Sequence, residues 1–220
     1  MSSLSIDSVI FGFEGALKVL LIKHSDGIST GKWALPGGFV GFDESLDTAA
    51  SRILFQLTGL NHIYLEQLKA FGAVDRFPEG RVVTISYYAL IQSNKIGLVP
   101  GFTASEVKWA ALNEIGALPY DHNEILNYAL KSLQQKVKLE PVGFNLLPKS
   151  FSLLELQKVY ESILQIKLDK PNFRRKILKT GLLKKSKGKQ KGVPHRAAML
   201  FEFDEAVYQK FKTQKFILEF

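Results

Sequence analysis

The sequence predicts an α/β domain, built on a mixed sheet flanked by helices, followed by a basic domain of helices and a β-hairpin. Charge is the first observation behind this prediction: residues 1–140 carry 12 Lys and Arg against 14 Asp and Glu, whereas residues 141–220 carry 17 against 7. The second observation is a stretch with two prolines and a glycine just after this change of charge. We therefore expect domains at 1–138 and 150–220, joined by a linker at 139–149.

Apolar, β-branched runs predict four strands in the first domain. These runs are Ser5–Phe11, Lys18–Ile22, Val82–Ile91 and Glu106–Ala111. A helix is expected over residues 44–57, capped by Asp43 and stopped by Gly59. A second helix is expected to open at Asp121 and to run to about residue 136.

The second domain opens with the capping-box sequence Ser152–Glu155, which predicts a helix. A second helix is expected over residues 170–180, because Pro171 suits a first turn and Gly181 suits a stop. Strand-like segments at 182–184 and 198–203 then flank a basic loop. This order is the layout of a winged helix-turn-helix. Since residues 170–196 hold 11 basic residues and no acidic one, we expect this domain to bind double-stranded DNA.

The composition excludes several other classes of protein. There is no cysteine, and therefore no disulfide, thiolate metal site or cysteine nucleophile. No apolar run approaches the roughly 20 residues that a membrane span needs, and the N-terminus lacks the layout of a signal peptide. We expect a soluble cytoplasmic protein without a membrane partner.

One spacing pattern in the first domain is specific. Gly38, Glu44, Arg52, Gly59 and Leu60 repeat the frame of a Nudix box, and the preceding Trp-Ala-Leu-Pro-Gly-Gly run resembles the lead-in of Nudix domains. Residues 4–137 thus resemble a Nudix domain, and the resemblance implies the Nudix-like mixed α/β sheet.

The second domain resembles the C-terminal DNA-binding part of Nudix-related transcriptional regulators. The segments that carry this resemblance are Leu147–Pro148, Phe151–Leu156 and Asn172–Leu178. Within that family the match is closest to the sugar-responsive branch typified by the bacterial arabinose regulator AraR. The resemblance implies a regulator with an effector-binding domain. Because helix-turn-helix proteins usually read two half-sites, we expect a homodimer.

The Nudix box is broken where the hydrolytic chemistry would lie. Nudix hydrolases place three glutamates on the helix to hold Mg²⁺, whereas this sequence has Ile53, Gln56 and Leu57 there. We expect no metal site, no cofactor and no enzymatic activity, with Glu44 and Arg52 kept for structural reasons. A metal site rebuilt from elsewhere in the fold is the alternative.

A non-catalytic domain fused to a DNA-binding domain is best explained as a sensor of a small molecule, which we expect to be a sugar. Polar or flat residues among the strand residues are the candidate effector contacts, since each buried hydroxyl of a ligand needs a partner. The candidates are Asp7, Lys23, His24, Trp33, Glu44, Ser86 and Tyr88. The Asp75–Pro78 segment is left open as a turn, a ligand clamp or a dimer contact.

Helical projection separates two faces of the 170–180 helix. Phe173, Ile177 and Leu178 share the expected core face, with Arg174 beside them as a residue that pairs with Glu155 or Glu161. The opposite face and the wing loop hold the candidate DNA contacts. These are Asn172, Arg175, Lys176 and Lys179 on the helix, and Lys187, Lys189, Lys191 and Arg196 on the wing.

The sequence therefore predicts a DNA-binding regulator of sugar use whose effector is L-arabinose. Three alternatives stay open: an ADP-ribose-responsive regulator of NAD metabolism, an active Nudix pyrophosphohydrolase, and a DNA- or RNA-binding adaptor without an effector. Losing the metal ligands makes a neutral sugar the favoured effector over a diphosphate.

Overall fold

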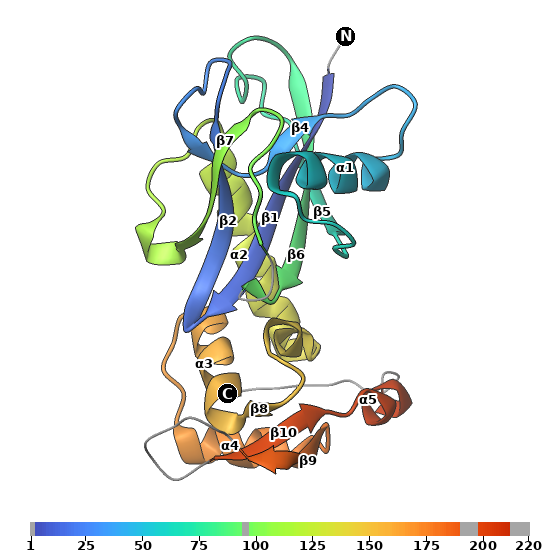
Figure 1. Cartoon of the computed structure of the whole chain (residues 1–220), viewed down its shortest axis with the longest axis vertical. Helices are drawn as coiled ribbons and strands as arrows, with labels where there is room; N and C mark the ends of the chain where they lie inside the picture. Colours follow the sequence, from blue (N-terminus) through green and yellow to red (C-terminus); the bar gives the residue numbers. More distant parts are fainter. Residues whose placement is uncertain (1–2, 94–96, 190–197, 212–220) are drawn as a thin grey trace. The chain divides into compact units, whose positions relative to one another are not determined.

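The computed structural model describes residues 3–93, 97–189 and 198–211. The chain divides into two compact units, Met1–Lys131 and Ser132–Phe220, and each is described by itself (Figure 1). The division falls seven residues before the boundary predicted at residue 138. No helix among the described residues has the length and apolar character that crossing a membrane requires.

A mixed seven-stranded sheet forms the centre of the first unit, within the residues described. Its strands are β1 (Ser3–Glu14), β2 (Ala16–His24), β3 (Trp33–Ala34), β4 (Gly37–Phe39), β5 (Glu66–Phe71), β6 (Val82–Ile91) and β7 (Ala104–Ala111). Strand β1 runs parallel to β6 and antiparallel to β2 and β4. The predicted Nudix-like fold class is confirmed.

Helix α1 (Leu46–Thr58) packs against one face of this sheet. Its Ile53 and Leu57 side chains lie in the same core cluster as Ile6 of β1. The helix begins at Ser45, whose side chain accepts from the Thr48 N–H, so the predicted cap Asp43 is wrong by two residues. Gly59 ends it as predicted, with a left-handed φ of 74° that a side chain would strain.

Helix α2 (His122–Leu139) crosses behind strands β1 and β2 in Figure 1. Its apolar face is buried at Ile125, Ala129, Leu133 and Val137, a spacing of four that follows the helical repeat. The helix starts near the predicted position. The division between the two units falls within it.

Three α-helices begin in the described part of the second unit, beside a small sheet. Its elements are the 3₁₀ segment η3 (Val142–Leu146), β8 (Phe151–Ser152), α3 (Leu153–Leu164), α4 (Lys170–Lys179), β9 (Leu183–Lys189), β10 (Met199–Phe203) and α5 (Glu205–Phe211). The sheet order is β8-β10-β9, with antiparallel pairing throughout. Two helices followed by a two-stranded wing confirm the predicted winged helix domain.

Sequence signals at the helix ends of this unit are confirmed. Ser152 forms the predicted capping box with Glu155 at the start of α3, and Pro171 lies in the first turn of α4 as predicted. Asp169, which was not predicted as a cap, accepts from the Asn172 N–H at the start of α4.

Arg174 lies exposed, and the contacts of the described residues give it neither of the expected ion pairs. Glu155 is occupied by its capping box, and Glu161 accepts from Gln157 and from the Leu168 N–H. Leu178 is wrong as a core residue, because 47% of it is exposed.

Residues 139–149 do not behave as the linker that we predicted. Phe144, Leu146 and Leu147 are buried, and the Phe144 ring stacks on Phe203 at 4.6 Å between centroids. Phe144 also lies 5.7 Å from the ring of Phe151. Prolines near a change of charge suggested a flexible join, but the apolar residues between them fill the core of the second unit.

Candidate functional site

A cavity of about 500 Å³ lies in the first unit. Strands β1 and β4, helix α1, the loops after β2 and before β6, and the start of α2 all contribute to its walls. The residues that line it are Ser5, Asp7, His24, Asp26, Gly27, Ile28, Ser29, Leu35, Gly37, Gly38, Phe39, Arg52, Ile53, Gln56, Leu57, Arg76, Phe77, Glu79, Val82, Phe102, Thr103, Tyr120 and His122.

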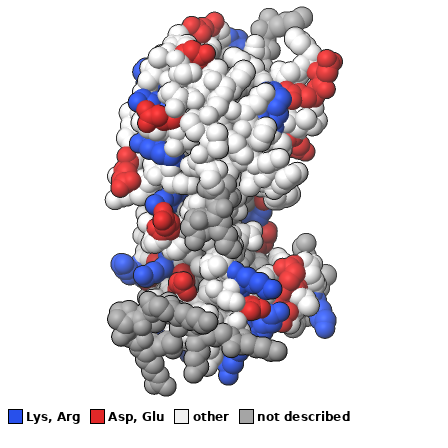
Figure 2. All heavy atoms as spheres, viewed as in Figure 1, with Lys and Arg blue, Asp and Glu red and all other residues white. Residues whose placement is uncertain are grey.

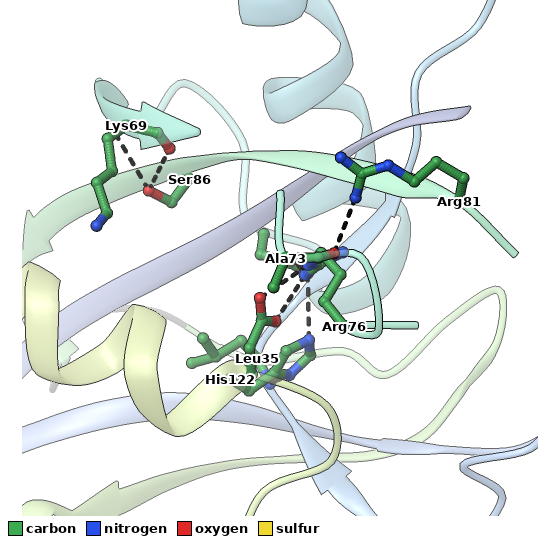
Figure 3. Close-up of polar contacts among 9 residues, drawn as sticks. Leu35, Lys69, Ala73, Arg76, Arg81, Ser86 and His122 are labelled. Atoms are coloured by element: carbon green, nitrogen blue, oxygen red, sulfur yellow. Dashed lines mark hydrogen bonds and ion pairs between the residues drawn. The ribbon is translucent and has the colours of Figure 1, made fainter. Parts of the chain in front are cut away.

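A buried ion-pair network forms one side of the cavity (Figure 3). Arg76 Nη2 lies 3.1 Å from Asp7 Oδ2 and 2.7 Å from Asp121 Oδ1. Burial by itself would raise the pKa of Asp7, but the neighbouring His122 and Arg76 outweigh it and lower that pKa. Asp7 therefore stays ionised at neutral pH. Strand β4 can pass beside it only at a glycine, because a Cβ atom at Gly37 would overlap the carboxylate.

His122 completes this network from the first residue of α2 (Figure 3). Its Nδ1 atom accepts the Leu35 N–H at 3.1 Å, so that nitrogen carries a lone pair. The proton of the neutral ring then lies on Nε2, which is 3.4 Å from Asp7 Oδ1. His24, across the cavity, has its pKa lowered by burial and by His122.

The residues that remain from the Nudix box form a second network. Arg52 Nε and Nη2 donate to the two carboxylate oxygens of Glu44 at 2.9 and 2.5 Å, and Gly41 N–H donates to Glu44 at 2.6 Å. The hydrogen bonds from Arg52 lower the pKa of Glu44 to about 2. Glu44 thus braces the loop before α1, and it does not line the cavity.

The positions of the missing glutamates face the same cavity. Ile53 and Leu57 line it with apolar groups, and Gln56 brings a neutral amide. No group of three or more His, Cys, Asp or Glu residues in the described part of the chain is arranged to hold a metal ion. The donor set at this helix does not fit Mg²⁺, which prefers several carboxylate oxygens.

Aromatic rings form another wall of the cavity. Phe77 lies 5.2 Å from Tyr120 and 6.4 Å from Phe39, measured between ring centroids. The Ser29 hydroxyl donates to the Tyr120 hydroxyl at 2.9 Å, which fixes that ring. The cavity therefore combines flat apolar faces with charged and polar groups, the composition typical of small-molecule sites.

The structure brings only two of the seven predicted effector contacts to the cavity, Asp7 and His24. Lys23 instead pairs with Glu106 at 2.7 Å and lies 5.9 Å from the Trp33 ring, outside the cavity lining. Alternation along β2 explains the difference, since neighbouring side chains of a strand point to opposite faces. Trp33 and Glu44 also lie outside.

The two predicted contacts on β6 serve the sheet. Ser86 is fully buried and donates to the Lys69 carbonyl at 2.9 Å, as Figure 3 shows. Tyr88 donates to Glu66 of β5 at 3.1 Å. Both predictions are wrong as cavity contacts, because these side chains are used in cross-strand bonds.

Arg76 and His122 are two of the cavity residues that were not predicted as effector contacts. Arg76 lies in the segment that we had left open as a turn, a clamp or a dimer contact. His122 lies in what looked like a capping box, yet the Asp121 carboxylate that should cap the helix binds Arg76 instead. A histidine beside an expected helix start was the available signal.

Helix α4 presents the candidate DNA contacts of the second unit. Phe173 and Ile177 are buried, whereas Arg175 and Lys179 are exposed and Asn172 and Lys176 are partly exposed. Arg175 donates to Asn172 Oδ1 at 2.9 Å. The side chains of Lys187 and Lys189, and the whole of Lys191 and Arg196, lie outside the described residues. Figure 2 shows Lys and Arg atoms on the face of this unit that is in view, with acidic atoms among them.

Comparison with known proteins identifies the family of this chain. Residues 1–132 match the model of the NUDIX domain, and residues 143–203 match the model described as NrtR DNA-binding winged helix domain. The chain is 35% identical over 206 residues to an Acinetobacter baylyi protein named ADPR responsive transcriptional repressor NtrR, covering 91% of this chain and 81% of that protein. The chain belongs to the NrtR family.

Solved structures of NrtR are similar to this chain in both of its domains. A Shewanella oneidensis NrtR complexed with a 27mer DNA is 31% identical, with a TM-score of 0.76 over 94% of this chain and 95% of that one. The NUDIX domain of the same protein, complexed with ADP ribose, is 33% identical with a TM-score of 0.57, covering 60% of this chain and 89% of that one.

These matches correct the subfamily, the effector and the metabolic role that we predicted from the sequence. Placement in the arabinose-regulator branch is wrong, because the relative matched along the chain is an NrtR-type repressor named for its response to ADPR. The L-arabinose effector and the assignment to carbohydrate metabolism are wrong for the same reason. Preferring a neutral sugar because the metal ligands are missing assumed that a diphosphate needs a metal in this cleft.

Proposed function

We propose that this chain is a transcriptional repressor of NAD metabolism that responds to ADP-ribose. The observation that carries the proposal is the match across both domains to a relative named as an ADPR-responsive repressor. The Shewanella NUDIX domain that was crystallised with ADP ribose supports the same effector for the cavity described above. ADP-ribose replaces L-arabinose in this reading.

The cavity is chemically suited to such a ligand. Rings such as Phe77 and Tyr120 offer flat faces on which adenine can stack. The ionised Asp7 carboxylate can accept hydrogen bonds from ribose hydroxyls, and Arg52 and Arg76 bring positive charge for phosphate groups. A volume of about 500 Å³ lies within the range typical of small-molecule sites.

We further propose that the first domain binds its effector without cleaving it. Ile53 and Leu57 cannot ligate a cation, and Gln56 offers a single neutral oxygen that already accepts from Arg52. Without a bound metal ion, the domain lacks the group that activates water in hydrolases of this fold. Incubation with ADP-ribose and Mg²⁺ is therefore expected to release no AMP.

The second domain is proposed to bind operator DNA through α4 and the wing. The exposure of Arg175 and Lys179 on α4 supports this proposal, and the DNA contacts of the wing residues remain a prediction. A homodimer is proposed because two half-sites are usually read together. Sedimentation of the free protein tests this proposal, and a cytoplasmic location remains an expectation.

One experiment tests the coupling of effector to DNA. Operator DNA is titrated with the full chain in the presence of ADP-ribose, L-arabinose or neither, and the effector is titrated in turn with and without DNA. ADP-ribose should change DNA affinity, and DNA should change ADP-ribose affinity by the same factor. An unchanged DNA affinity with ADP-ribose, or an equal change with L-arabinose, would reject the proposal.

A further inference from the structure

The side-chain amide of Gln56 has a fixed orientation in the cavity wall. Its Oε1 atom accepts a hydrogen bond from Arg52 Nη1 at 3.0 Å, one helical turn earlier on α1. The amide nitrogen Nε2, which carries two N–H donors, must then point away from Arg52. No contact within residues 3–93, 97–189 and 198–211 gives this nitrogen a hydrogen-bond partner. Gln56 therefore brings donors to the cavity that it lines.

Arg52 has one donor left for the cavity as well. A guanidinium group carries five N–H donors. Four of them are used: one on Nε and one on Nη2 by Glu44, a second on Nη2 by the Phe39 carbonyl, and one on Nη1 by Gln56. The remaining N–H is on Nη1, beside Gln56. Two neighbouring side chains thus hold unused donors at one place on the cavity wall.

This arrangement reverses the polarity of the corresponding helix face in Nudix hydrolases. Three glutamates at positions 53, 56 and 57 would present only acceptors, which repel a diphosphate unless a cation lies between them. Here the apolar Ile53 and Leu57 remove that repulsion, and Gln56 replaces an acceptor with donors. Hydrogen bonds from such donors to an anion are among the strong ones.

We propose that this face of α1 binds the diphosphate of the effector directly, through Gln56 Nε2 and the remaining Arg52 N–H, without a divalent cation. The inference rests on the proposed function, in which the effector is ADP-ribose. It adds the part of the ligand that α1 recognises and explains how the cleft retains a diphosphate after losing its metal ligands.

Calorimetry on the full chain tests the proposal. ADP-ribose is titrated in Mg²⁺ and in EDTA, and the two Kd values should agree within about twofold. The Gln56→Glu variant keeps the bond from Arg52, because a carboxylate oxygen also accepts it, but it turns the free donors into a charged acceptor. Its affinity should fall at least about tenfold, as expected for losing a hydrogen bond to a charged group, and Mg²⁺ should not restore it.

The chain offers a matched control for this substitution. Gln67 is exposed on β5 and lies outside the cavity. Its Oε1 atom is 3.3 Å from the Tyr87 hydroxyl, but that hydroxyl donates its single proton to Asp47 at 2.7 Å. Since Gln67 does not line the cavity, Gln67→Glu should bind ADP-ribose as the wild type does. Thermal unfolding of both variants confirms that they are folded.

Distinct outcomes separate this inference from the proposed function. Binding of ADP-ribose that requires Mg²⁺, or full affinity in Gln56→Glu, overturns the inference and leaves the ADP-ribose effector in place. No binding of ADP-ribose by the wild type in either buffer rejects the proposed function. In that case ADP serves as the probe: metal-independent binding that Gln56→Glu weakens supports the donor pair, and any other result with ADP overturns it.

Discussion

Arg76 holds Asp121 through two parallel hydrogen bonds, from Nε to Oδ2 at 2.8 Å and from Nη2 to Oδ1 at 2.7 Å. This forked geometry suits a guanidinium and a carboxylate and cannot be reproduced by lysine. Because Arg76 lies in the loop between β5 and β6, the pair fixes that loop to the residue before α2. The loop in turn supplies Phe77 and Glu79 to the cavity.

Arg76→Ala should destabilise the protein strongly. The Arg76 side chain is 4% exposed, and its removal leaves Asp7 and Asp121 as charges without their cationic partner. Breaking a buried ion pair in this way costs about 3–5 kcal/mol. Urea denaturation of the full chain, followed by the fluorescence of its two tryptophans, measures the loss.

Arg81 provides the control for this variant within the same loop. It is exposed and donates to the carbonyl groups of Gly72 and Ala73 at 2.8 Å. Those carbonyls can bind water after the side chain is removed, so Arg81→Ala should cost less than about 1 kcal/mol. Equal losses in the two variants would show that the buried network at Arg76 is not what stabilises the loop.

Stability should fall with acid in a way that depends on Glu44. Its pKa is lowered to about 2 from an ordinary value of 4.5, so its contribution is complete above pH 4.5 and is lost as the pH falls through 2. Glu44→Gln should therefore be less stable than wild type at neutral pH, and the difference should shrink below pH 4.5. Melting temperatures at pH 7, 4 and 2.5 measure it; a constant difference would contradict the prediction.

His122→Leu should lose more stability than His122→Asn. The Leu35 N–H is buried and donates to His122 Nδ1, and leucine would leave it without an acceptor at a cost of about 1–3 kcal/mol. Asparagine presents its Oδ1 atom near the position of Nδ1 and can keep the bond. Chemical denaturation ranks the two variants, and hydrogen exchange at Leu35 reports on the bond itself. Slower or unchanged exchange at Leu35 in His122→Leu would refute this assignment.

Operator binding should depend on the exposed basic residues of α4. Arg175→Ala and Lys179→Ala should each weaken binding by about 1–3 kcal/mol where a base is contacted, with a smaller salt dependence where a phosphate is contacted. Lys158, exposed on α3, is the matched control and should have little effect. Fluorescence anisotropy at several salt concentrations measures the affinity for operator DNA and its salt dependence. A larger effect at Lys158 than at Arg175 would assign the DNA surface to another helix.

Long apolar segments were predictable from the sequence, whereas short or polar strands were not. The predicted strand Val82–Ile91 matches β6 to the residue, because β-branched, aromatic and other apolar residues form an almost unbroken run over these ten positions. Strands β3 and β4 have two and three residues and exist because they pair with distant strands. Strand β5 is half polar, with Glu66, Gln67 and Lys69 among its six residues, and its pairing with β6 defines it.

The cavity was only partly predictable for a related reason. Asp7 was found because a carboxylate inside an apolar strand needs a partner, but that partner is Arg76, 69 residues later in a loop. The broken Nudix box correctly located α1 and its apolar positions. The identity of the effector depends on how several loops are arranged around those positions, and no local sequence pattern predicts that tertiary arrangement.

Helix α2 has a practical consequence for anyone who wishes to isolate the effector-binding half. Its first residue, His122, belongs to the cavity wall, while residues from Ser132 onward belong to the second compact unit. A fragment that stops at Lys131 would shorten the helix and discard Leu133 and Val137, both fully buried. Ending the fragment at Leu139 keeps all 18 residues of the helix, with the backbone hydrogen bonds of its second half, and a longer helix is the more stable one.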